Sequence, residues 1–478
     1  MMNPLAVWKF GFELRSWSPS YQRRLMRVYQ PFGMTNIRKI KTVIVAGGRG
    51  TRLGDLTVDI PKPLVTVGER SILEHLILQL RTFGLNEILL ATGHLGHVIE
   101  ERLGDGRQMG VSVTHVRENS PQGSAGCLRP LRDWVSEDFL VIYADVFQAM
   151  DLARLVDFHL RNHSRATLVV HPNNHPHDSD IVVAREDGAI TDLLCKKNPR
   201  PRYFNNLVNA GVHILNRAVF QYLPETGMVD LVGDLLPTML QAGEPLFAYR
   251  TGEYLKDMGT PPRLEEVRVA WSNGQVQARS WCAPAQPAIF LDRDGTLIEY
   301  VPLAHTLEHI QLYPWSVSAI RTINRAGIAC FLVTNQPVVA RNLCTLEDIY
   351  RAHDKIETLL GEGGAFLDDI RFCPHHPDGG FAGENPIYKI RCTCRKPGSD
   401  MIEDLANRYN IDLESSWFIG DSSVDIMTGR NAGMKSLLVE TGEGGRDGRC
   451  ALEPDRTCSN LETAVTYALR RIQERMGL

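Results

Sequence analysis

The sequence predicts an α/β protein with two domains in tandem. Apolar, strand-like runs alternate with helical patterns from residue 41 to about residue 270, and a second alternation follows from residue 288 to about residue 442. Such alternation favours a largely parallel sheet with helices on both faces. The chain has 478 residues, more than one ordinary core holds, which also favours two or three domains.

The first alternation can be followed run by run. Its strand-like runs lie at residues 42–45, 87–91, 111–115, 139–143, 166–171 and 211–215. Residues 71–83 carry apolar side chains at helical spacing, which predicts a helix between the first two strands. Residues 272–287 then lose this period and gather small, polar and proline residues, which is typical of a linker.

The second alternation begins with a strand over 288–291. A helix is expected over 317–326, a strand over 328–333, a helix over 346–360 and a strand over 417–419. After Gly445 the sequence predicts a loop and a terminal helix over 460–475. The predicted division is a basic extension (1–38), a first domain (39–271), the linker (272–287), a second domain (288–445) and a C-terminal tail with a helix (446–478).

Composition argues against several classes of function. A formal net charge of −4 argues against a nucleic-acid surface. No apolar run approaches the roughly 20 residues that span a bilayer, and the first 40 residues lack the apolar segment of a secretory signal. Ten cysteines are too sparse for a disulfide scaffold and fit a reducing cytoplasm. The basic extension is compatible with a start-site artefact, a flexible arm or a partner-binding segment.

A glycine-rich turn follows the first strand directly. Glycines there let backbone N–H groups approach phosphate oxygens, although a turn of this kind is often purely structural. Arg52 and Lys62 follow and supply two fixed cations, so the turn and the cations together predict a triphosphate site. The residues of the turn are Gly47, Gly48, Gly50 and Thr51.

This region resembles the sugar-1-phosphate nucleotidyltransferases over about residues 40–270. The motif G-G-x-G-T-R-L followed by P-K-P-L matches their signature, and further motifs follow in the family's order. These are Glu118 with Gly123-Ser-Ala-Gly126, Tyr143-Ala-Asp145, Asn209-Ala-Gly211 and Lys256-Asp257-Met-Gly-Thr-Pro261. The resemblance implies that Gly123 binds the nucleotide, that Asn209 contacts the sugar, and that Asp145 and Asp257 hold Mg²⁺.

The reaction implied by this resemblance is transfer of a nucleotidyl group. A sugar 1-phosphate oxygen attacks the α-phosphorus of a nucleoside triphosphate and pyrophosphate leaves, so catalysis consists of alignment and charge neutralisation. Arg52 and Lys62 would stabilise the pyrophosphate and the transition state. The sequence looks like the guanylyltransferases that act on mannose-type sugars, which makes GTP the first choice of donor.

Two details near the first site have alternatives. The family has Glu-Lys-Pro where this chain has Cys195-Lys196-Lys197-Asn198-Pro199. Lys196 is the expected contact to the substrate phosphate, Lys197 could take that role, and a solvated basic pair is the structural alternative. The histidines at 171, 175 and 177 are interleaved with prolines and asparagines, which favours a loop over a metal site.

Acidic residues also follow the first strand of the second domain. Asp292 and Asp294 could merely cap a turn, but later strands end in polar residues too, and a cation follows. These later residues are Thr334, Asn335, Arg395, Lys396, Asp421 and Asp425. The ordered set resembles the haloacid-dehalogenase-like phosphohydrolases over about residues 288–442.

By this resemblance Asp292 is the nucleophile that takes the phosphoryl group, and Asp294 protonates the leaving sugar oxygen and then activates water. Thr334 and Lys396 bind the transferring phosphoryl oxygens. The site needs Mg²⁺ because an anionic carboxylate does not easily approach an anionic phosphate without a cation between them. The implied Mg²⁺ ligands are Asp292, Asp294 through its backbone carbonyl and Asp421, with Asp425 in support.

Three cysteines and a histidine of the second domain have the spacing of a metal site. They form a C-x-H pair and a C-x-C pair about 17 residues apart, with His376 as an alternative to His375 and chance clustering as the alternative to a site. Four such ligands fit a closed tetrahedral Zn²⁺ of structural type, which would hold the loop 377–391 over the aspartates. The predicted ligands are Cys373, His375, Cys392 and Cys394.

Three features of the second domain point to a smaller group within this family: the zinc-loop pattern and the motifs D-R-D-G-T and T-N-Q. The domain is similar to the D-glycero-D-manno-heptose 1,7-bisphosphate 7-phosphatases and to their histidinol-phosphate phosphatase relatives. Asn335 and Arg395 are then expected to contact substrate. The family's Ser-Gly after T-N-Q is Pro337-Val338 here, which predicts an altered specificity.

Together the resemblances imply two Rossmann-like domains: a glycosyltransferase-A-like mixed sheet, then a haloacid-dehalogenase-like parallel sheet with a zinc loop. They imply a cytoplasmic bifunctional enzyme that uses Mg²⁺, binds a nucleoside triphosphate and heptose phosphates, and could form a homo-oligomer. Heptose 1,7-bisphosphate would become heptose 1-phosphate and then a nucleoside-diphosphate heptose. The alternatives are a histidinol-phosphate-type phosphatase beside a transferase for another sugar, or one half that is a non-catalytic regulatory module.

Overall fold

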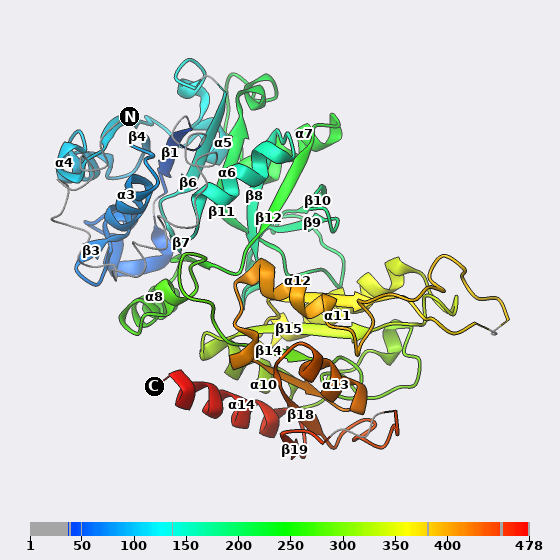
Figure 1. Cartoon of the computed structure of the whole chain (residues 1–478). Helices are drawn as coiled ribbons and strands as arrows, with labels where there is room; N and C mark the ends of the chain where they lie inside the picture. The colour runs from blue at the N-terminus through cyan, green and yellow to red at the C-terminus, as the bar shows by residue number, and fades with distance from the viewer. Residues whose placement is uncertain are drawn as a thin grey trace, which may run out of the picture.

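A computed structural model describes Ile37 and residues 40–48, 50–135, 137–379, 382–449 and 453–476. The predicted basic extension, with its arginines, lies outside the described residues apart from Ile37. Figure 1 shows two α/β bodies, a first one coloured blue to green and a second one coloured green to red. Among the helices of the described ranges, none has the length and apolar character needed to cross a membrane.

The first body contains a sheet of nine strands, which is mixed as predicted. Its main path runs β10-β9-β11-β6-β1-β4-β5, and β11 runs antiparallel to β6 while β1 runs parallel to both neighbours. Off this path, β8 pairs with β11 and β12 pairs with β8. The strands are β1 (Lys41–Ala46), β4 (Glu87–Thr92), β5 (Ser112–Arg117), β6 (Asp138–Tyr143), β8 (Ala166–His171), β9 (Ile181–Ala184), β10 (Ile190–Leu194), β11 (Val208–Asn216) and β12 (Leu246–Arg250).

Shorter elements complete the first body. The helix α3 begins after Ser71, whose side chain and the Glu74 side chain form a reciprocal capping box. A small sheet pairs β7 (Val146–Ala149) with β13 (Tyr254–Asp257), and another pairs β2 (Thr66–Val67) with β3 (Arg70–Ser71). The helices are α3 (Ile72–Thr82), α4 (Gly96–Leu103), α5 (Gly123–Gly126), α6 (Leu152–Arg161), α7 (Leu236–Gln241) and α8 (Pro261–Ser272), with short turns η3 (Thr51–Thr57), η4 (Lys62–Leu64) and η7 (Pro176–Asp178).

The second body contains a six-stranded sheet that is parallel throughout, also as predicted. Its order is β16-β15-β14-β17-β18-β19, so that the strand carrying Asp292 at its end lies in the middle. The strands are β14 (Ala288–Leu291), β15 (Ala329–Asn335), β16 (Asp369–Cys373), β17 (Trp417–Gly420), β18 (Lys435–Val439) and β19 (Arg456–Cys458). The helices are α10 (Ser316–Arg325), α11 (Leu346–Glu362), α12 (Asp400–Tyr409), α13 (Ser423–Asn431) and α14 (Leu461–Met476).

Two segments differ from their sequence description. The predicted linker contains the short helix α9 (Gln275–Ala278) and buries Val276, Cys282 and Ala283, so it is a packed connection. Beyond Gly445 the chain adds β19 to the sheet, and α14 buries an apolar face in the same core as α10. The three-residue strand β19 is too short to show a strand period, so it could not be predicted from the sequence.

Candidate active sites

The glycine-rich turn of the first body is packed between Lys62 and Glu118. Gly50 has a positive φ of 65°, and a Cβ there would lie 3.2 Å from the Lys62 Cβ. A Cβ on Gly47 would lie 3.0 Å from a carboxylate oxygen of Glu118. Side chains at these two positions would crowd the turn, so its glycines hold the main chain close to both charged groups.

Two of the predicted metal ligands lie beside each other although they are over 100 residues apart. Asp257 ends β13 opposite Val146 of β7, and the Met258 N–H donates to the Asp145 carbonyl at 3.0 Å. The Asp145 carboxylate pairs with Lys62 at 2.6 Å, and its side chain is 38% exposed. The small β7–β13 sheet therefore brings both aspartates to one edge of the domain, where a ligand has access to Asp145.

A second layer of charge surrounds Asp257. Arg263 at the start of α8 bridges Asp257 and Asp178, each at 2.8 Å. Arg52 lies 3.7 Å from Asp178, and His175 Nε2 lies 3.6 Å from Asp257. Burial raises the pKa of Asp257, but Arg263 and His175 outweigh it and hold the pKa below its ordinary value.

Three of these neighbours were not singled out as site residues from the sequence: Arg263, Asp178 and His175. The only available signal was the position of Arg263 just after the Lys256–Pro261 motif. Asp178 and His175 lie on the histidine-containing segment between β8 and β9, which is a loop around η7, as predicted. This segment, residues 172–180, is called the η7 loop below.

The other predicted residues of the first site make contacts that do not involve Asp145 or Asp257. Gly123 has a φ of 82°, and a Cβ there would lie 2.3 Å from the Val229 carbonyl oxygen, so only glycine fits. The Asn209 carboxamide oxygen accepts from His213 at 2.9 Å and from the Gly211 N–H at 3.3 Å. Lys196 and Lys197 lie on an exposed turn after β10, and both ammonium groups remain candidates for the phosphate contact.

The second body gathers three carboxylates at the ends of its central strands. Oxygens of Asp292, Asp421 and Asp425 all lie within 4.8 Å of one another. Lys396 Nζ contacts the Asp292 carboxylate and donates to Asp425 at 2.7 Å. Burial raises the pKa values of Asp292 and Asp421, and Lys396 offsets this only in part for Asp292. Carboxylates crowded in this way fit a divalent cation.

Asp294 follows Asp292 by two residues, and its carboxylate is held by its own set of hydrogen bonds. The carboxylate accepts from Arg293 at 3.0 Å and from Gln336 Nε2 at 2.9 Å, and Gln336 also donates to Thr334 Oγ1 at 3.0 Å. Arg293 and Gln336 thus fix the position of its carboxylate, and the predicted metal role of Asp294 falls to its backbone carbonyl. Arg293 and Gln336 stand inside the motifs D-R-D-G-T and T-N-Q, yet their orienting role was missed because it depends on rotamers.

The predicted cysteine and histidine ligands form one compact cluster. The sulfurs of Cys373, Cys392 and Cys394 lie 3.3 to 3.5 Å apart, and His375 Nδ1 lies 3.4 Å from Cys394 and 3.6 Å from Cys373. Sulfurs around a tetrahedral Zn²⁺ at about 2.3 Å would lie about 3.8 Å apart, so the donor set fits that ion. His376 instead bonds the main chain of Asp378.

The predicted substrate residues of the second body connect the cluster to the aspartates. The Asn335 carboxamide bonds both the N–H and the carbonyl of Lys396, at 2.9 and 3.1 Å. Arg395 donates to the His375 carbonyl at 3.2 Å. Val338, where the sequence departs from the family, is 1% exposed in a small core with Val339 and Ile349, so its side chain points away from solvent.

Comparisons with known proteins divide the chain in the same way. The family model Nucleotidyl transferase matches residues 41–273, and the model HAD-hydrolase-like matches residues 393–464. The D-glycero-D-manno-heptose-1,7-bisphosphate 7-phosphatase of Thermosynechococcus vestitus is 36% identical over 197 residues, which are 40% of this chain and 99% of that protein.

Two further matches have a lower sequence identity, and one of them is a solved structure. The mannose-1-phosphate guanylyltransferase of Mycobacterium tuberculosis is 29% identical over 225 residues, and the chain spans 62% of its length. A solved D,D-heptose 1,7-bisphosphate phosphatase from B. bronchiseptica, complexed with magnesium and phosphate, is 32% identical with a TM-score of 0.34. This structural match covers 39% of the present chain and 99% of the phosphatase chain.

Proposed function

We propose that this protein makes a nucleotide-activated heptose in two steps. The premise is that its second half belongs to the D-glycero-D-manno-heptose-1,7-bisphosphate 7-phosphatase family and that its first half is a nucleotidyl transferase domain. The second half removes the 7-phosphate of D-glycero-D-manno-heptose 1,7-bisphosphate. The first half transfers a nucleotidyl group from a nucleoside triphosphate, by preference GTP, to the heptose 1-phosphate. The predicted fusion of a nucleotidyltransferase with a phosphatase is confirmed by these matches.

The observation that carries the phosphatase assignment is the buried lysine between carboxylates. Lys396 contacts Asp292 and Asp425 where a phosphoryl group would enter. Asp292 attacks the phosphorus, the bond to the sugar oxygen breaks, and Asp294 donates the proton that this oxygen takes up. Asp294 then accepts a proton from the water that hydrolyses the aspartyl phosphate. Asp292, the Asp294 carbonyl and Asp421 would hold Mg²⁺, which supplies charge neutralisation during attack.

The transferase half works by alignment. Arg52, Lys62 and the glycine-rich turn hold the triphosphate, and the 1-phosphate oxygen of the sugar attacks the α-phosphorus as pyrophosphate leaves. Asp145 and Asp257 would hold Mg²⁺, whose charge offsets that of the α-phosphate. Free thiols at the described cysteines outside the cluster fit a reducing compartment, and we place the reaction in the cytoplasm.

Glu118 supports GTP as the donor. Its carboxylate lies beside the glycine-rich turn, and one of its oxygens is buried without a hydrogen-bond partner. Burial raises the pKa of this carboxyl group. A carboxylate only accepts hydrogen bonds, and guanine presents adjacent N–H donors at N1 and N2 that match two carboxylate oxygens.

The test is to supply the pure protein with Mg²⁺ and D-glycero-D-manno-heptose 1,7-bisphosphate, and to add each nucleoside triphosphate separately. Phosphate, pyrophosphate and nucleotide-sugar are measured, with histidinol phosphate as the competing phosphatase substrate. We expect phosphate release without nucleotide, and pyrophosphate release that is faster with GTP than with the other nucleoside triphosphates. Faster hydrolysis of histidinol phosphate, or no pyrophosphate with any nucleotide, would contradict the proposal.

A further inference from the structure

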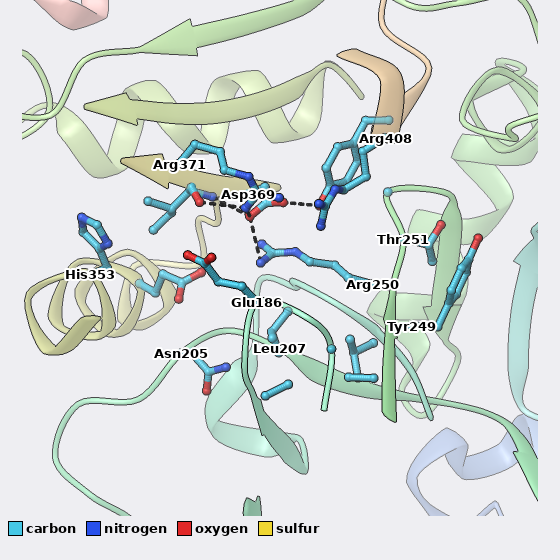
Figure 2. A pocket seen from close by; sticks show the side chains of 18 of the residues that line it. Glu186, Asn205, Leu207, Tyr249, Arg250, Thr251, His353, Asp369, Arg371 and Arg408 are labelled. Carbon is cyan, nitrogen blue, oxygen red and sulfur yellow. Dashed lines mark hydrogen bonds and ion pairs between the residues drawn. The ribbon is translucent and has the colours of Figure 1, made fainter. Parts of the chain in front are cut away.

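The helix α11 of the phosphatase half contacts both halves of the chain. Towards its start, Ile349 packs on Val338 and Val339, and the His353 ring meets Phe372 at 5.3 Å. Towards its end, Glu357, Thr358 and Gly361 face the transferase half. Figure 2 shows the cavity at this boundary, with His353 on one side and Asn205 and Leu207 of the transferase half on the other.

The contacts at the end of α11 are buried and specific. Thr358 Oγ1 accepts from the Phe204 N–H at 2.9 Å and donates to the Phe204 carbonyl at 3.0 Å. The Glu357 carboxylate accepts from the Asn206 N–H at 3.1 Å. Thr358 is 1% exposed and Glu357 is 7% exposed, so water does not replace these bonds when they are lost.

Asn206 links the end of α11 to the η7 loop by hydrogen bonds. Its carboxamide donates to the Asn173 carbonyl at 2.8 Å and accepts from the Asn173 N–H at 3.2 Å. The Asn173 side chain in turn accepts from the His175 N–H at 2.9 Å. The helix also touches the loop directly, since a Cβ on Gly361 would lie 2.6 Å from the Pro176 ring.

The far side of the η7 loop belongs to the transferase site. His175 lies 3.6 Å from Asp257, and Asp178 pairs with Arg263 and lies near Arg52. The position of α11 is therefore connected, through Phe204, Asn206 and the η7 loop, to the groups around the predicted metal ligand. We propose that Glu357 and Thr358 of the phosphatase half are positioning residues for nucleotidyl transfer.

Other contacts hold the halves together without α11. Arg250 at the end of β12 pairs with Asp369 of β16 at 3.0 Å, as Figure 2 shows. Arg279 pairs with Asp368 at 2.6 Å. Because these pairs lie elsewhere on the boundary, removing the Thr358 hydroxyl would loosen the η7 loop without separating the halves.

The experiment compares Thr358→Val with Thr358→Ser in the full chain. Valine keeps the volume and loses both hydrogen bonds, whereas serine keeps them. We expect Thr358→Val to lower the transferase kcat roughly 10-fold, as small misplacements of catalytic groups do, and to raise the Mg²⁺ concentration for half-maximal transfer. Phosphatase activity should stay within about twofold, and Thr358→Ser should behave as the unmodified chain.

Gly361→Ala is a second variant that adds a methyl group against Pro176 and favours the helix. It should show the same selective loss. An unchanged transferase kcat and Mg²⁺ dependence in both variants, or an equal fall of both activities with the melting temperature, would overturn the proposal. Amide exchange over residues 172–180 tests the structural step by itself, and it should be faster in Thr358→Val than in Thr358→Ser or the unmodified chain. If the unmodified chain transfers no nucleotide to heptose 1-phosphate, the proposed function is refuted, and the exchange result still decides whether Thr358 holds the loop.

Discussion

Replacing Cys392 by serine should remove a bound zinc ion and destabilise the phosphatase half. Cys392 lies 3.5 Å from Cys373 and 3.3 Å from Cys394, so one substitution breaks the only sulfur and imidazole cluster found among the described residues. Serine is a poor ligand for Zn²⁺ beside two thiolates. The segment between the two halves of the cluster would then lose its attachment.

The size of the effect follows from the length of that segment. Cys373 and Cys392 are 19 residues apart in the chain. Closing a loop of this length lowers the entropy of the unfolded chain, and the loss of the closure costs about 3 kcal/mol at 25 °C. For a domain of this size about 3 kcal/mol corresponds to a fall of about 6–12 °C in the melting temperature. Direct metal–ligand bonding would add to this value.

Elemental analysis and calorimetry of the full chain provide the assay, with Cys344→Ser as the matched control because Cys344 lies outside the cluster. We expect about one zinc per chain in the unmodified protein and in the control, and a lower transition temperature only for Cys392→Ser. Purified protein with reduced thiols and no zinc would refute the reasoning. So would a Cys392→Ser transition that coincides with that of the control.

Other predictions concern single side chains of the two sites. Asp292→Asn should lower phosphate release at least about 1000-fold while nucleotide-sugar formation from supplied heptose 1-phosphate stays nearly intact, and loss of both activities in a folded variant would count against independent sites. Asp257→Asn should lower transfer by about 100-fold or more with phosphatase activity unchanged, as measured by pyrophosphate release; normal transfer would exclude Asp257 as a metal ligand. Glu118→Gln should lower kcat/KM for GTP by about 10- to 100-fold and affect UTP less, and an equal fall for both nucleotides would contradict a role in reading the base.

Long elements with a clear hydrophobic period could be predicted from the sequence. The expected strands at 166–171 and 288–291 coincide with β8 and β14, and the expected helix over 346–360 falls within α11. Short strands of mixed character were missed. β7 and β13 have four residues each, and β13 reads Tyr-Leu-Lys-Asp, which has no strand alternation. Their pairing depends on contacts across the whole first domain.

The side chains of the two candidate sites could be grouped from the sequence for a different reason. They stand in motifs at the ends of strands, and parallel strands bring such ends to one edge of the sheet. The sequence could not show which basic side chain pairs with each carboxylate. Arg263 reaches Asp257 from the first turn of α8, and the η7 loop is fixed by a helix of the other half, so both depend on packing between distant segments.

In both candidate sites a lysine is paired with a carboxylate that is a predicted metal ligand. Lys62 pairs with Asp145 and Lys396 contacts Asp292, and in each pair the lysine side chain is less than 10% exposed. Removing Lys396 would leave two buried carboxylates without their cation, and removing Asp145 would leave the Lys62 ammonium with little water around it, each at a cost of several kcal/mol. Under the proposed function, a phosphate that arrives together with a divalent cation would avoid this cost, because the lysine would face the phosphate and the carboxylate would face the cation. Each lysine would therefore hold its carboxylate ready for the metal before substrate binds and would contact the phosphate afterwards, which gives a reason for a lysine and a carboxylate at both sites.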